Sequence, residues 1–529
     1  MPKFLAFFLL LSVFFFSCAR KNFFQQTALT NPAEKVAIAT GKTPDSVTVT
    51  VGRHYDKGFL QQVFFGKHYR ELWATPVKLP VYRMQQEHGG LTPISLGGGF
   101  QTTSLTLKDR TGSLFVLRSL DKDPQKTLPK SLRNSFLVNL VRDQTSAANP
   151  FAPVVLPTLS KAAGIFYSTP KLVYVTENDS TFGKFAPRIL GKVMLLEEKF
   201  SNKQTLKPMF GNAIDLVNSE ALLHHRFEEN KHKIDQQLFA RSRLFDVLIG
   251  DWDRHKGQWQ WAVYKQDSGY LYKPIPKDRD QTFYKFNDGV ITWLASNTPF
   301  LKKFQTFHHN YGNLSGWLFN ARFIDARALN EVTREEWNQH AEAIKAALND
   351  EVINEAFSNL PNLVYQKIGP ETIAKLKSRR DKLPAAADKI YLILAKEVTV
   401  AGTDQKEKFV VKRLASGETQ VEVFSNETAS KKLLYFRTFK PNETKKIVLH
   451  GLGSEDEFEI SGKARKAIDL AIYGGEGEDE IKNTSKIKGW GNAIKVYDTT
   501  RGMVFENTRG VKKKLSRNVA VNAYDREGL

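Results

Sequence analysis

The fold is decided by Phe245-Asp246-Val247-Leu248-Ile249-Gly250-Asp251-Trp252-Asp253-Arg254-His255-Lys256-Gly257-Gln258-Trp259. Apolar residues at helical spacing lead into this segment, which predicts a buried helix that ends in a polar loop. Strand-like residues follow, and the next strand ends in Lys277-Asp278-Arg279-Asp280-Gln281-Thr282-Phe283. Two acidic loops that face each other can hold a divalent cation and orient a nucleophile.

This layout has the plan of a phosphoryl-transfer site. In such a site one Asp accepts the proton of the attacking hydroxyl, and a later amide and a further Asp hold the metal ion. Asp253 takes the first position and Gln258, five residues on, the second. Asp278 and Asp280 both qualify as the further metal ligand, and their spacing to Phe283 does not decide between them.

The residues upstream add the phosphate-binding parts. Gly97, Gly98 and Gly99 lie between two predicted strands and run into Gln101. Glycine lets backbone amides approach a phosphate closely, so this loop is predicted to cover the nucleotide. Arg118 lies on the third predicted strand, where a cation can pair with phosphate.

The loop around Asp253 resembles the catalytic loop of the secretory-pathway kinases of the Golgi casein-kinase and four-jointed type. The stretch Asp280-Gln281-Thr282-Phe283 is also similar to the metal loop of the spore-coat CotH kinases. The resemblance implies a catalytic role for Asp253, a metal-binding role for Asp278 or Asp280, and Mg²⁺ or Mn²⁺ with a nucleotide as cofactors. It covers roughly residues 90–395.

Two positions depart from that pattern, and a third role is not assigned by it. Arg118 stands where these families have lysine, and Asp251 stands where they have asparagine. A helix acid should orient the strand cation; Asp143 is the first candidate for this role and Gln144 the second.

The runs at 69–77 and 97–105 resemble exported bacterial proteins in which such a segment lies between a phosphoesterase and a BamA-type outer-membrane barrel. Neither neighbour has a counterpart in this sequence. An outer-membrane protein is therefore a candidate partner.

The acids also have a structural interpretation. Arg254, Arg279 and Lys277 could pair with them in an internal salt-bridge network without any ligand. Kinase folds also persist as binding modules, so a nucleotide site and catalysis are separate predictions.

The first residues predict export and lipid attachment. An apolar run from Phe4 to Phe16 follows one positive charge, and it is shorter than the roughly 20 residues of a membrane-spanning helix. Cys18, the only cysteine, comes directly after it and resembles the lipobox of bacterial lipoproteins. We expect a signal peptide over residues 1–17, acylation at Cys18 and a membrane-anchored protein of the bacterial envelope. It would lie on the outer membrane, facing either the periplasm or the cell surface.

The composition supports a folded, basic protein. The chain has 529 residues, a formal charge of +21 and 41% hydrophobic residues. Its Lys and Arg residues are spread along the whole chain without a nucleic-acid motif, which favours an anionic membrane surface over nucleic acid.

The region after residue 396 changes to short Val-, Ile- and Thr-rich segments with repeated turn signals, which predicts a separate all-β domain. Within it, Gly474-Gly475-Glu476-Gly477-Glu478-Asp479-Glu480-Ile481 fits the turn of calcium-binding β-rolls, and residues 451–458 are a weaker echo of this pattern. Gly475, Gly477 and Asp479 are the candidate Ca²⁺ residues, and a tight glycine turn with surface acids is the alternative.

The sequence thus predicts an α+β protein with a two-lobed kinase-like domain followed by an all-β domain. The expected parts are a signal peptide (1–17), a flexible tether (18–50), the kinase-like domain (51–396, with lobes at about 90–200 and 201–396) and the β domain (397–529). The first functional hypothesis is a metal-dependent phosphotransferase of unknown substrate. The alternative is a non-catalytic surface or outer-membrane accessory protein that uses both domains for binding.

Overall fold

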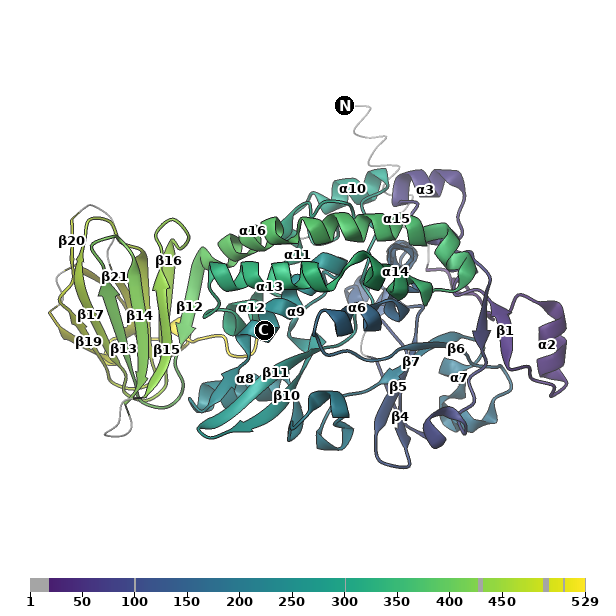
Figure 1. Cartoon of the computed structure of the whole chain (residues 1–529), viewed down its shortest axis with the longest axis horizontal. Helices are drawn as coiled ribbons and strands as arrows, with labels where there is room; N and C mark the ends of the chain where they lie inside the picture. Colours follow the sequence, from purple (N-terminus) through teal and green to yellow (C-terminus); the bar gives the residue numbers. More distant parts are fainter. Residues whose placement is uncertain are drawn as a thin grey trace.

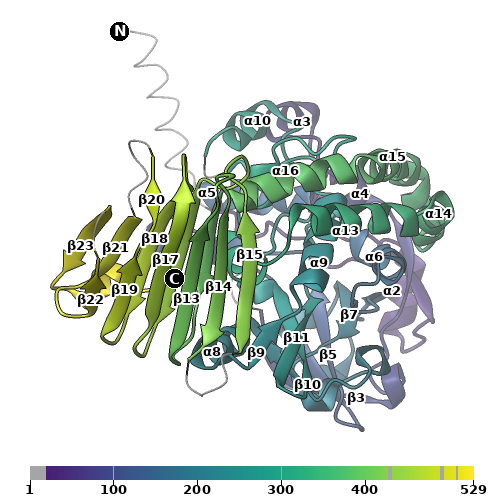
Figure 2. The same ribbon diagram turned by 60° about the vertical axis from the view of Figure 1, so that its left-hand side comes forward.

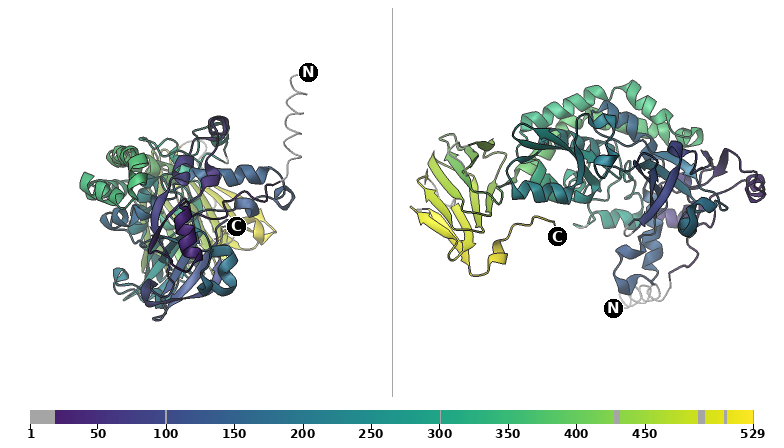
Figure 3. Two further views of the ribbon diagram at one scale, coloured as in Figure 1. Left: turned by 90° about the vertical axis from the view of Figure 1, so that its right-hand side faces the viewer. Right: turned by 90° about the horizontal axis from the view of Figure 1, so that it is seen from below.

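The structure is a computed structural model that describes residues 19–98, 101–299, 301–426, 432–488, 494–507 and 510–528. The signal peptide, Cys18 and Gly99 lie outside the described residues. Three regions follow one another along the long axis of the molecule, as the right-hand view of Figure 3 shows. An N-terminal lobe lies at one end, the β domain at the other and a helical lobe between them (Figure 1).

The N-terminal lobe is built on an antiparallel sheet in the order β3-β4-β5-β7-β6. Alternate residues of its central strands, such as Leu105, Leu107 and Leu117, are buried, because successive side chains of a strand point to opposite faces. The three strands predicted around the glycine loop are present. The strands are β3 (Leu91–Gly97), β4 (Ser104–Asp109), β5 (Leu114–Ser119), β6 (Lys171–Tyr174) and β7 (Val193–Glu198).

The residues before this sheet are folded. The expectation of a flexible tether over 18–50 does not hold for its described part, because Phe23, Leu29 and Val47 are buried in the core. The segment forms helix α2 (Pro32–Ala39) and strand β1 (Ser46–Val49), which pairs with β2 (Val77–Pro80). Its few apolar residues are spaced so that they reach the core of the neighbouring lobe. Helices α3 (Phe59–Phe65), α4 (Arg70–Ala74), α5 (Leu137–Asp143), α6 (Leu156–Ala162) and α7 (Ala186–Ile189) complete the lobe.

The helical lobe surrounds the buried helix α9 (Gln236–Ile249), which begins at the capping side chain of Asp235 and ends at Gly250. Beside it lies a four-stranded sheet in the order β8-β10-β11-β9, formed by β8 (Asp215–Asn218), β9 (His232–Ile234), β10 (Trp259–Gln266) and β11 (Gly269–Pro276). A capping box formed by Thr333 and Glu336 starts α13. The other helices are α8 (Ser219–Glu228), α10 (Val290–Ser296), α11 (Leu314–Trp317), α12 (Arg322–Ala328), α13 (Arg334–Ala347), α14 (Asp350–Ser358), α15 (Asn362–Asp381) and α16 (Leu383–Ala395).

The C-terminal region is an all-β domain of two sheets, in the orders β12-β16-β18-β21-β23 and β15-β14-β13-β17-β19-β22 (Figure 2). From β16 onward the chain alternates between the sheets, and successive strands of each sheet are parallel. The strands are β12 (Glu397–Ala401), β13 (Glu407–Arg413), β14 (Thr419–Ser425), β15 (Leu433–Phe439), β16 (Lys446–Leu452), β17 (Glu457–Ala464), β18 (Asp469–Gly475), β19 (Asp479–Asn483), β20 (Lys486–Ile487), β21 (Ile494–Thr499), β22 (Met503–Glu506) and β23 (Val511–Ser516).

In this part of the domain the chain winds in successive turns whose strands pair in parallel, and we call it the coil. Leu449 pairs with Ile472, and Phe458 with Ile481, so equivalent residues of adjacent turns stack on each other. The weak sequence echo at 451–458 is therefore the turn below the one at 474–481. The α+β class with a separate all-β domain is confirmed.

Candidate functional site

The loop that carries Asp253 is positioned by the end of α9. Gly250 adopts φ 73° there, and a Cβ atom at this position would lie 2.9 Å from the ring of Phe307. Glycine meets both demands because it has no side chain and adopts positive φ readily. The chain can thus leave the buried helix sharply and enter the loop at Asp251.

A buried carboxylate on α9 ties the two acidic loops together. Asp246 is fully buried, and its oxygens lie 3.1 Å from Nη1 of Arg243, 3.2 Å from Nε of Arg254 and 2.9 Å from Nη2 of Arg279. Arg254 also donates hydrogen bonds to the backbone oxygens of Lys277 (2.6 Å) and Gln258 (3.0 Å). Loss of Asp246 would leave three buried guanidinium groups without this partner.

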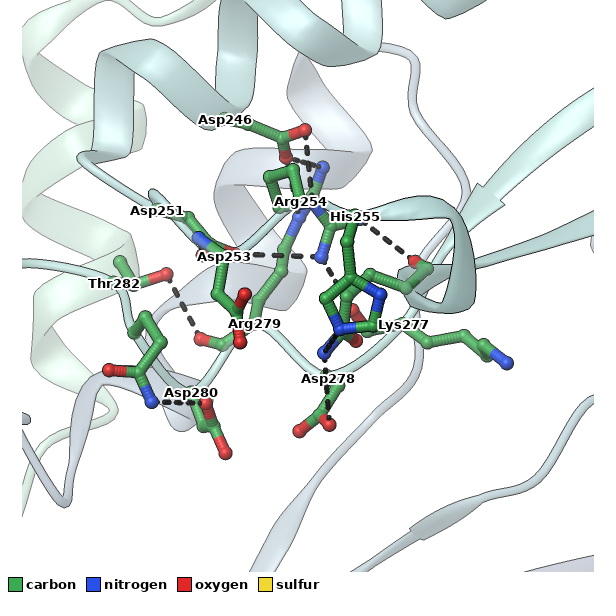
Figure 4. A network of polar contacts seen from close by, with 12 residues as sticks. Asp246, Asp251, Asp253, Arg254, His255, Lys277, Asp278, Arg279, Asp280 and Thr282 are labelled. Carbon is green, nitrogen blue, oxygen red and sulfur yellow. Dashed lines mark hydrogen bonds and ion pairs between the residues drawn. The ribbon is translucent and has the colours of Figure 1, made fainter. Parts of the chain in front are cut away.

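A salt-bridge network exists, but it differs from the predicted one, because it is centred on Asp246 and lies behind the site. Arg254 and Arg279 pair with Asp246, not with the acids of the second loop. In Figure 4, Asp253, Asp278 and Asp280 point away from Asp246 to the same side of the two loops. The network holds the loops together and leaves these three carboxylates available at the surface of a cavity.

Asp253 is held by neighbours that hydrogen bond without neutralising it. Its Oδ1 accepts a hydrogen bond from Nδ2 of Asn320 (2.7 Å), and its backbone N–H donates to Oδ1 of Asp251 (3.2 Å). Lys303 in turn donates to Asn320 (3.0 Å). Burial raises the pKa of Asp251 to about 7, so this aspartate gains a proton more readily than an exposed one.

Asp278 and Asp280 face two cations from the N-terminal lobe. Arg118 pairs with Asp278 through a short contact, and Nζ of Lys122 lies 2.5 Å from Asp280. Burial acts to raise the pKa of Asp278, but the Arg118 and Lys122 charges outweigh it and hold that pKa well below its usual range. Burial and the charge of Asp278 raise the pKa of Asp280. Nε2 of Gln258 lies 3.4 Å from Asp278, so the predicted amide is at the site.

Asp143 does not take the orienting role predicted for it. Its carboxylate is buried and accepts two hydrogen bonds from Arg70, at 2.7 and 2.6 Å. Arg118 instead pairs with Glu197 on the neighbouring strand β7, at 2.8 Å. The reason is geometric, because β5 and β7 are paired strands and their side chains on one face lie within reach. Gln144 lines the cavity beside Arg118.

The glycine loop contributes in part. Gly98 adopts φ 91° and a Cβ atom there would lie 1.9 Å from the backbone oxygen of Thr102, so only glycine fits this turn. Gly98 and Gln101 line the cavity, whereas Gly97 ends strand β3. Gly99 is outside the described residues.

These side chains surround a cavity of about 1150 Å³ between the two lobes. One part of its wall is polar and carries the acids and cations. The other part is apolar and comes from α5, α10 and the loop before α11. The apolar lining includes Leu137, Leu140, Ile291, Ala295, Leu301 and Phe304. The cavity is slightly larger than most small-molecule and cofactor sites, whose volumes are roughly 300–1,000 Å³.

The donors present fit a divalent cation of the Mg²⁺ type. Among the described residues no three His, Cys, Asp or Glu side chains cluster as a metal site. Mg²⁺, however, is usually held by one or two carboxylates together with water and substrate phosphates. Asp278, Asp280 and the Gln258 amide provide such a partial set, provided that Arg118 and Lys122 release the carboxylates.

The predicted calcium residues lie at a turn of the coil. Gly475 (φ 122°) and Gly477 (φ 134°) pass so close to the turn below that a Cβ atom would lie 2.3 Å from the oxygen of Leu452 and 1.9 Å from that of Ser454. These glycines are needed for the stacking of turns. Asp479 is fully buried, so it is not a surface acid of a tight turn.

Asp479 belongs to a column of buried acids. Its Oδ1 accepts a hydrogen bond from the backbone N–H of Asp456 (2.8 Å), one turn below. The Oδ2 atoms of Asp456, Asp479 and Asp498 are buried and have no hydrogen-bond partner within the described part of the chain. Oδ2 of both Asp479 and Asp498 lies 2.2 Å from the point that a Cβ atom of Gly474 would occupy. Two acceptors thus converge with no donor between them.

Sequence reasoning did not identify three residues of the cavity. Lys122 lies four residues beyond Arg118, and a second cation so close to the end of a strand is only a weak indication of a phosphate-binding residue. Glu197 and Asn320 gave no local signal, because each meets its partner only through tertiary packing.

No family model matches the chain, and no curated protein matches it in sequence. Two solved structures are similar to it over part of its length. A proinflammatory kinase of Helicobacter pylori, CtkA, is 14% identical over 57% of this chain and 95% of its own, with a TM-score of 0.30. A chain of the toxin–antitoxin complex of HipA, HipB and operator DNA from Shewanella oneidensis MR-1 is 11% identical over 60% and 76%, with a TM-score of 0.27. Both likenesses are distant, and the chemistry of the cavity rests on its own contacts.

Proposed function

We propose that the cavity between the lobes binds a nucleoside triphosphate with Mg²⁺ or Mn²⁺ and transfers a phosphoryl group to an acceptor hydroxyl. One observation carries this proposal. Asp253 faces the same cavity as two acid–cation pairs, Asp278 with Arg118 and Asp280 with Lys122. Positioned charges of both signs around one cavity are what phosphoryl transfer requires of a protein.

The residues take distinct roles in this proposal. Asp253, held by Asn320, accepts the proton of the acceptor hydroxyl. The hydroxyl oxygen then bonds to the γ-phosphorus, while the bond between the γ-phosphorus and the departing nucleoside diphosphate breaks. Arg118 and Lys122 exchange their carboxylate partners for phosphate oxygens, and Asp278, Asp280 and Gln258 then hold the cation. The cation supplies charge stabilisation on the phosphates when it is bound.

The test is metal-dependent stabilisation by nucleotides of the chain from Ala19 onward. We expect ATP with Mg²⁺ or Mn²⁺ to raise the melting temperature of the wild type and of Asp253→Ala, but not that of Asp280→Ala. Asp267→Ala is a matched control, because this aspartate lies exposed at the β10–β11 turn. The absence of stabilisation by any nucleotide with either ion would contradict the proposal.

The second candidate function is a non-catalytic accessory protein that binds an anionic ligand in the same cavity. It is favoured by the mutual neutralisation of Asp278 with Arg118 and of Asp280 with Lys122, which satisfies these groups without a ligand. Nucleotide binding without modification of any acceptor, in both the wild type and Asp253→Ala, would support this candidate over the transferase.

We also propose that the protein is a lipoprotein of the bacterial envelope, acylated at Cys18. The support is the apolar run of residues 4–16 followed by the only cysteine. Among the described helices none is long and apolar enough to span a membrane. Mass spectrometry of the N-terminal peptide should find diacylglycerol on Cys18, and Cys18→Ser should release the protein from the membrane fraction.

For the β domain we propose a Ca²⁺ site at Asp479 that includes Asp498 and glycine carbonyls of the coil. The Oδ2 atoms of Asp479 and Asp498 converge beside Gly474, and neither has a hydrogen-bond donor among the described residues, which supports this proposal. Ca²⁺ takes carboxylate and backbone carbonyl oxygens readily. Calorimetric titration with Ca²⁺ should show binding that Asp479→Asn removes.

A further inference from the structure

An apolar surface made by two short helices is exposed at one edge of the molecule. Helices α3 and α10 lie side by side there in Figures 1 and 2. We call this the α3–α10 surface and define it by Phe59, Leu60, Phe64, Ile291, Trp293 and Leu294. Phe59 is 77% exposed and Trp293 54%. Neither helix contains a charged residue. Contiguous exposed apolar patches on soluble proteins mark interaction sites.

The surface is held firmly from behind. A Cβ atom at Gly289, before α10, would lie 2.2 Å from the backbone nitrogen of Gly66, which ends α3. The two helices are thus in direct backbone contact. The backbone N–H of His68 donates to Asp288 (2.7 Å), and the ring of His68 bonds to the oxygen of Phe286 (3.1 Å). These contacts hold the base of the two helices in place, so the apolar side chains above are presented on a fixed base.

The start of the described chain lies beside this surface. Lys57 precedes α3, and its Nζ lies 5.7 Å from the centre of the Phe23 ring. The charge of Arg20 acts on Lys57 and contributes to lowering its pKa, together with the larger effect of burial. The backbone N–H groups of Ala19 and Arg20 are fixed on residues 134 and 139. Cys18, the proposed acylation site, is the residue next to Ala19.

We infer that the α3–α10 surface docks on a lipid bilayer. The inference extends the proposed attachment at Cys18 and is independent of phosphoryl transfer. Acyl chains on Cys18 would enter the bilayer beside Lys57, within reach of this surface. Lys57 and the exposed Lys67 bracket α3, and lysines at the ends of an uncharged apolar segment suit an anionic lipid surface. Trp293 suits the interfacial region, where indole rings are enriched.

The docking also bears on the cavity. Ile291 and Ala295 of α10 belong to its apolar wall, so the cavity borders the α3–α10 surface. A bilayer on that surface would therefore lie next to the apolar wall of the cavity. Lipid or lipid-anchored molecules are the acceptors that such an arrangement would favour.

The test uses the chain from Ala19 onward, which lacks Cys18 and so reports the protein surface alone. Binding is measured by co-sedimentation with vesicles of phosphatidylethanolamine and phosphatidylglycerol in a ratio of about 3:1. About one lipid in four is then negatively charged, which gives an anionic surface. We expect the combined variant Phe59→Ser, Leu60→Ser, Trp293→Ser and Leu294→Ser to bind the vesicles at least about tenfold more weakly, because it loses the apolar surface that the bilayer would bury. The control variant Leu433→Ser with Phe436→Ser changes exposed apolar residues of the β domain and should bind as the wild type.

Tryptophan fluorescence provides an independent readout. Among the described residues Trp293 is the exposed tryptophan, while Trp73, Trp252, Trp259, Trp261, Trp317 and Trp337 are buried. Brominated lipids should quench the wild type and leave Trp293→Phe nearly unquenched.

Three results would overturn the inference: no vesicle binding by the wild type, equal binding by the combined variant, or loss of self-association in that variant as its only change. The last result would assign the surface to a second copy of the chain. Nucleotide-dependent thermal shifts of the same variant separate the two proposals, because α3–α10 docking and nucleotide binding can fail independently.

Discussion

The cavity and the β coil both hold groups of aspartates, which are half-buried in the cavity and buried in the coil, and the two regions surround them differently. In the cavity Asp278 faces Arg118, and Asp280 faces Lys122. In the coil Asp479 and Asp498 face each other across the space beside Gly474, with Oδ2 of each lacking a donor among the described residues. The same side chain is thus balanced by cations in one region and mainly by backbone N–H groups in the other.

The difference appears in the proton affinities. Burial acts to raise the pKa of Asp278, yet the nearby cations hold it well below the usual range. Burial raises the pKa of Asp479 to about 7 and that of Asp456 to about 9 with no cation to oppose it fully. The cavity therefore keeps charges that can change partners, whereas the coil needs a proton or a metal ion at each acid.

The largest effect should come from the acid that carries the proposed chemistry. Asp253→Asn removes the proton acceptor and keeps the shape, so we expect the rate of transfer to fall by roughly 100-fold or more. Nucleotide-dependent stabilisation should persist, since Asp253 belongs to neither acid–cation pair. Transfer at the wild-type rate would remove Asp253 from the proposed mechanism.

Breaking the balanced network should destabilise the fold strongly. Asp246→Asn removes the carboxylate that the buried Arg243, Arg254 and Arg279 share, and Arg243 keeps a second close carboxylate, that of Asp325. The loss should lower the free energy of unfolding by about 3–5 kcal/mol. Urea titration measures this change. Asp479→Asn in the coil is the contrasting variant, because at neutral pH it replaces an acid that has no cation and should cost much less. Equal losses would contradict the distinction between the two regions.

The coil acids predict how stability depends on pH. Asp456 and Asp479 have raised pKa values in the folded state, so the folded protein binds their protons more tightly than the unfolded chain. Their contribution to the free energy of unfolding is full below the pKa of about 4 that they have in the unfolded chain. It is lost as the pH rises through the folded-state pKa values, about 7 for Asp479 and about 9 for Asp456. Without Ca²⁺ the β domain should therefore lose stability as the pH rises between these limits, by at most about 1.4 kcal/mol per pH unit for each acid.

Chemical denaturation of the wild type at several pH values tests this dependence. The double variant Asp456→Asn with Asp479→Asn should show a flatter profile. A wild-type stability that rises over the same interval in the absence of Ca²⁺ would show that the acids are ionised and paired in solution.

Calcium should have the smallest of these effects on stability. At one hundred times its dissociation constant, a ligand that binds only the folded state adds about 2.7 kcal/mol. We expect the gain to grow with pH, because Ca²⁺ competes with protons for Asp479 and Asp498. Differential scanning calorimetry with Ca²⁺ and with Mg²⁺ measures it, and an equal gain in Asp479→Asn would exclude this site.

Much of the framework could be predicted from local patterns. The helix before Gly250, the loop with Asp253 and the hairpin before Asp278 follow from apolar periodicity and turn residues. The coil was visible as two similar glycine turns, whose separation equals one turn of the structure. The tether prediction failed because a polar, Asn- and Thr-rich segment still had enough apolar residues to fold onto the lobe.

Pairings between distant residues could not be predicted in the same way. Sequence order placed Asp143 on a helix where an orienting acid was expected, but Arg70 already binds it. Glu197 partners Arg118 because their strands are adjacent in the sheet, and Asn320 reaches Asp253 from a segment 67 residues further along the chain. The α3–α10 surface likewise exists only because packing brings two separate helices together.

The sequence by itself determined the elements, the two acidic loops and the repeat of the coil, because these depend on residues close to each other in the chain. Only the tertiary structure decided which cation faces which acid, that the coil acids are buried, and which apolar side chains stay exposed. The physical reason is that burial and pairing depend on contacts between distant segments, and these set the charge state of each carboxylate.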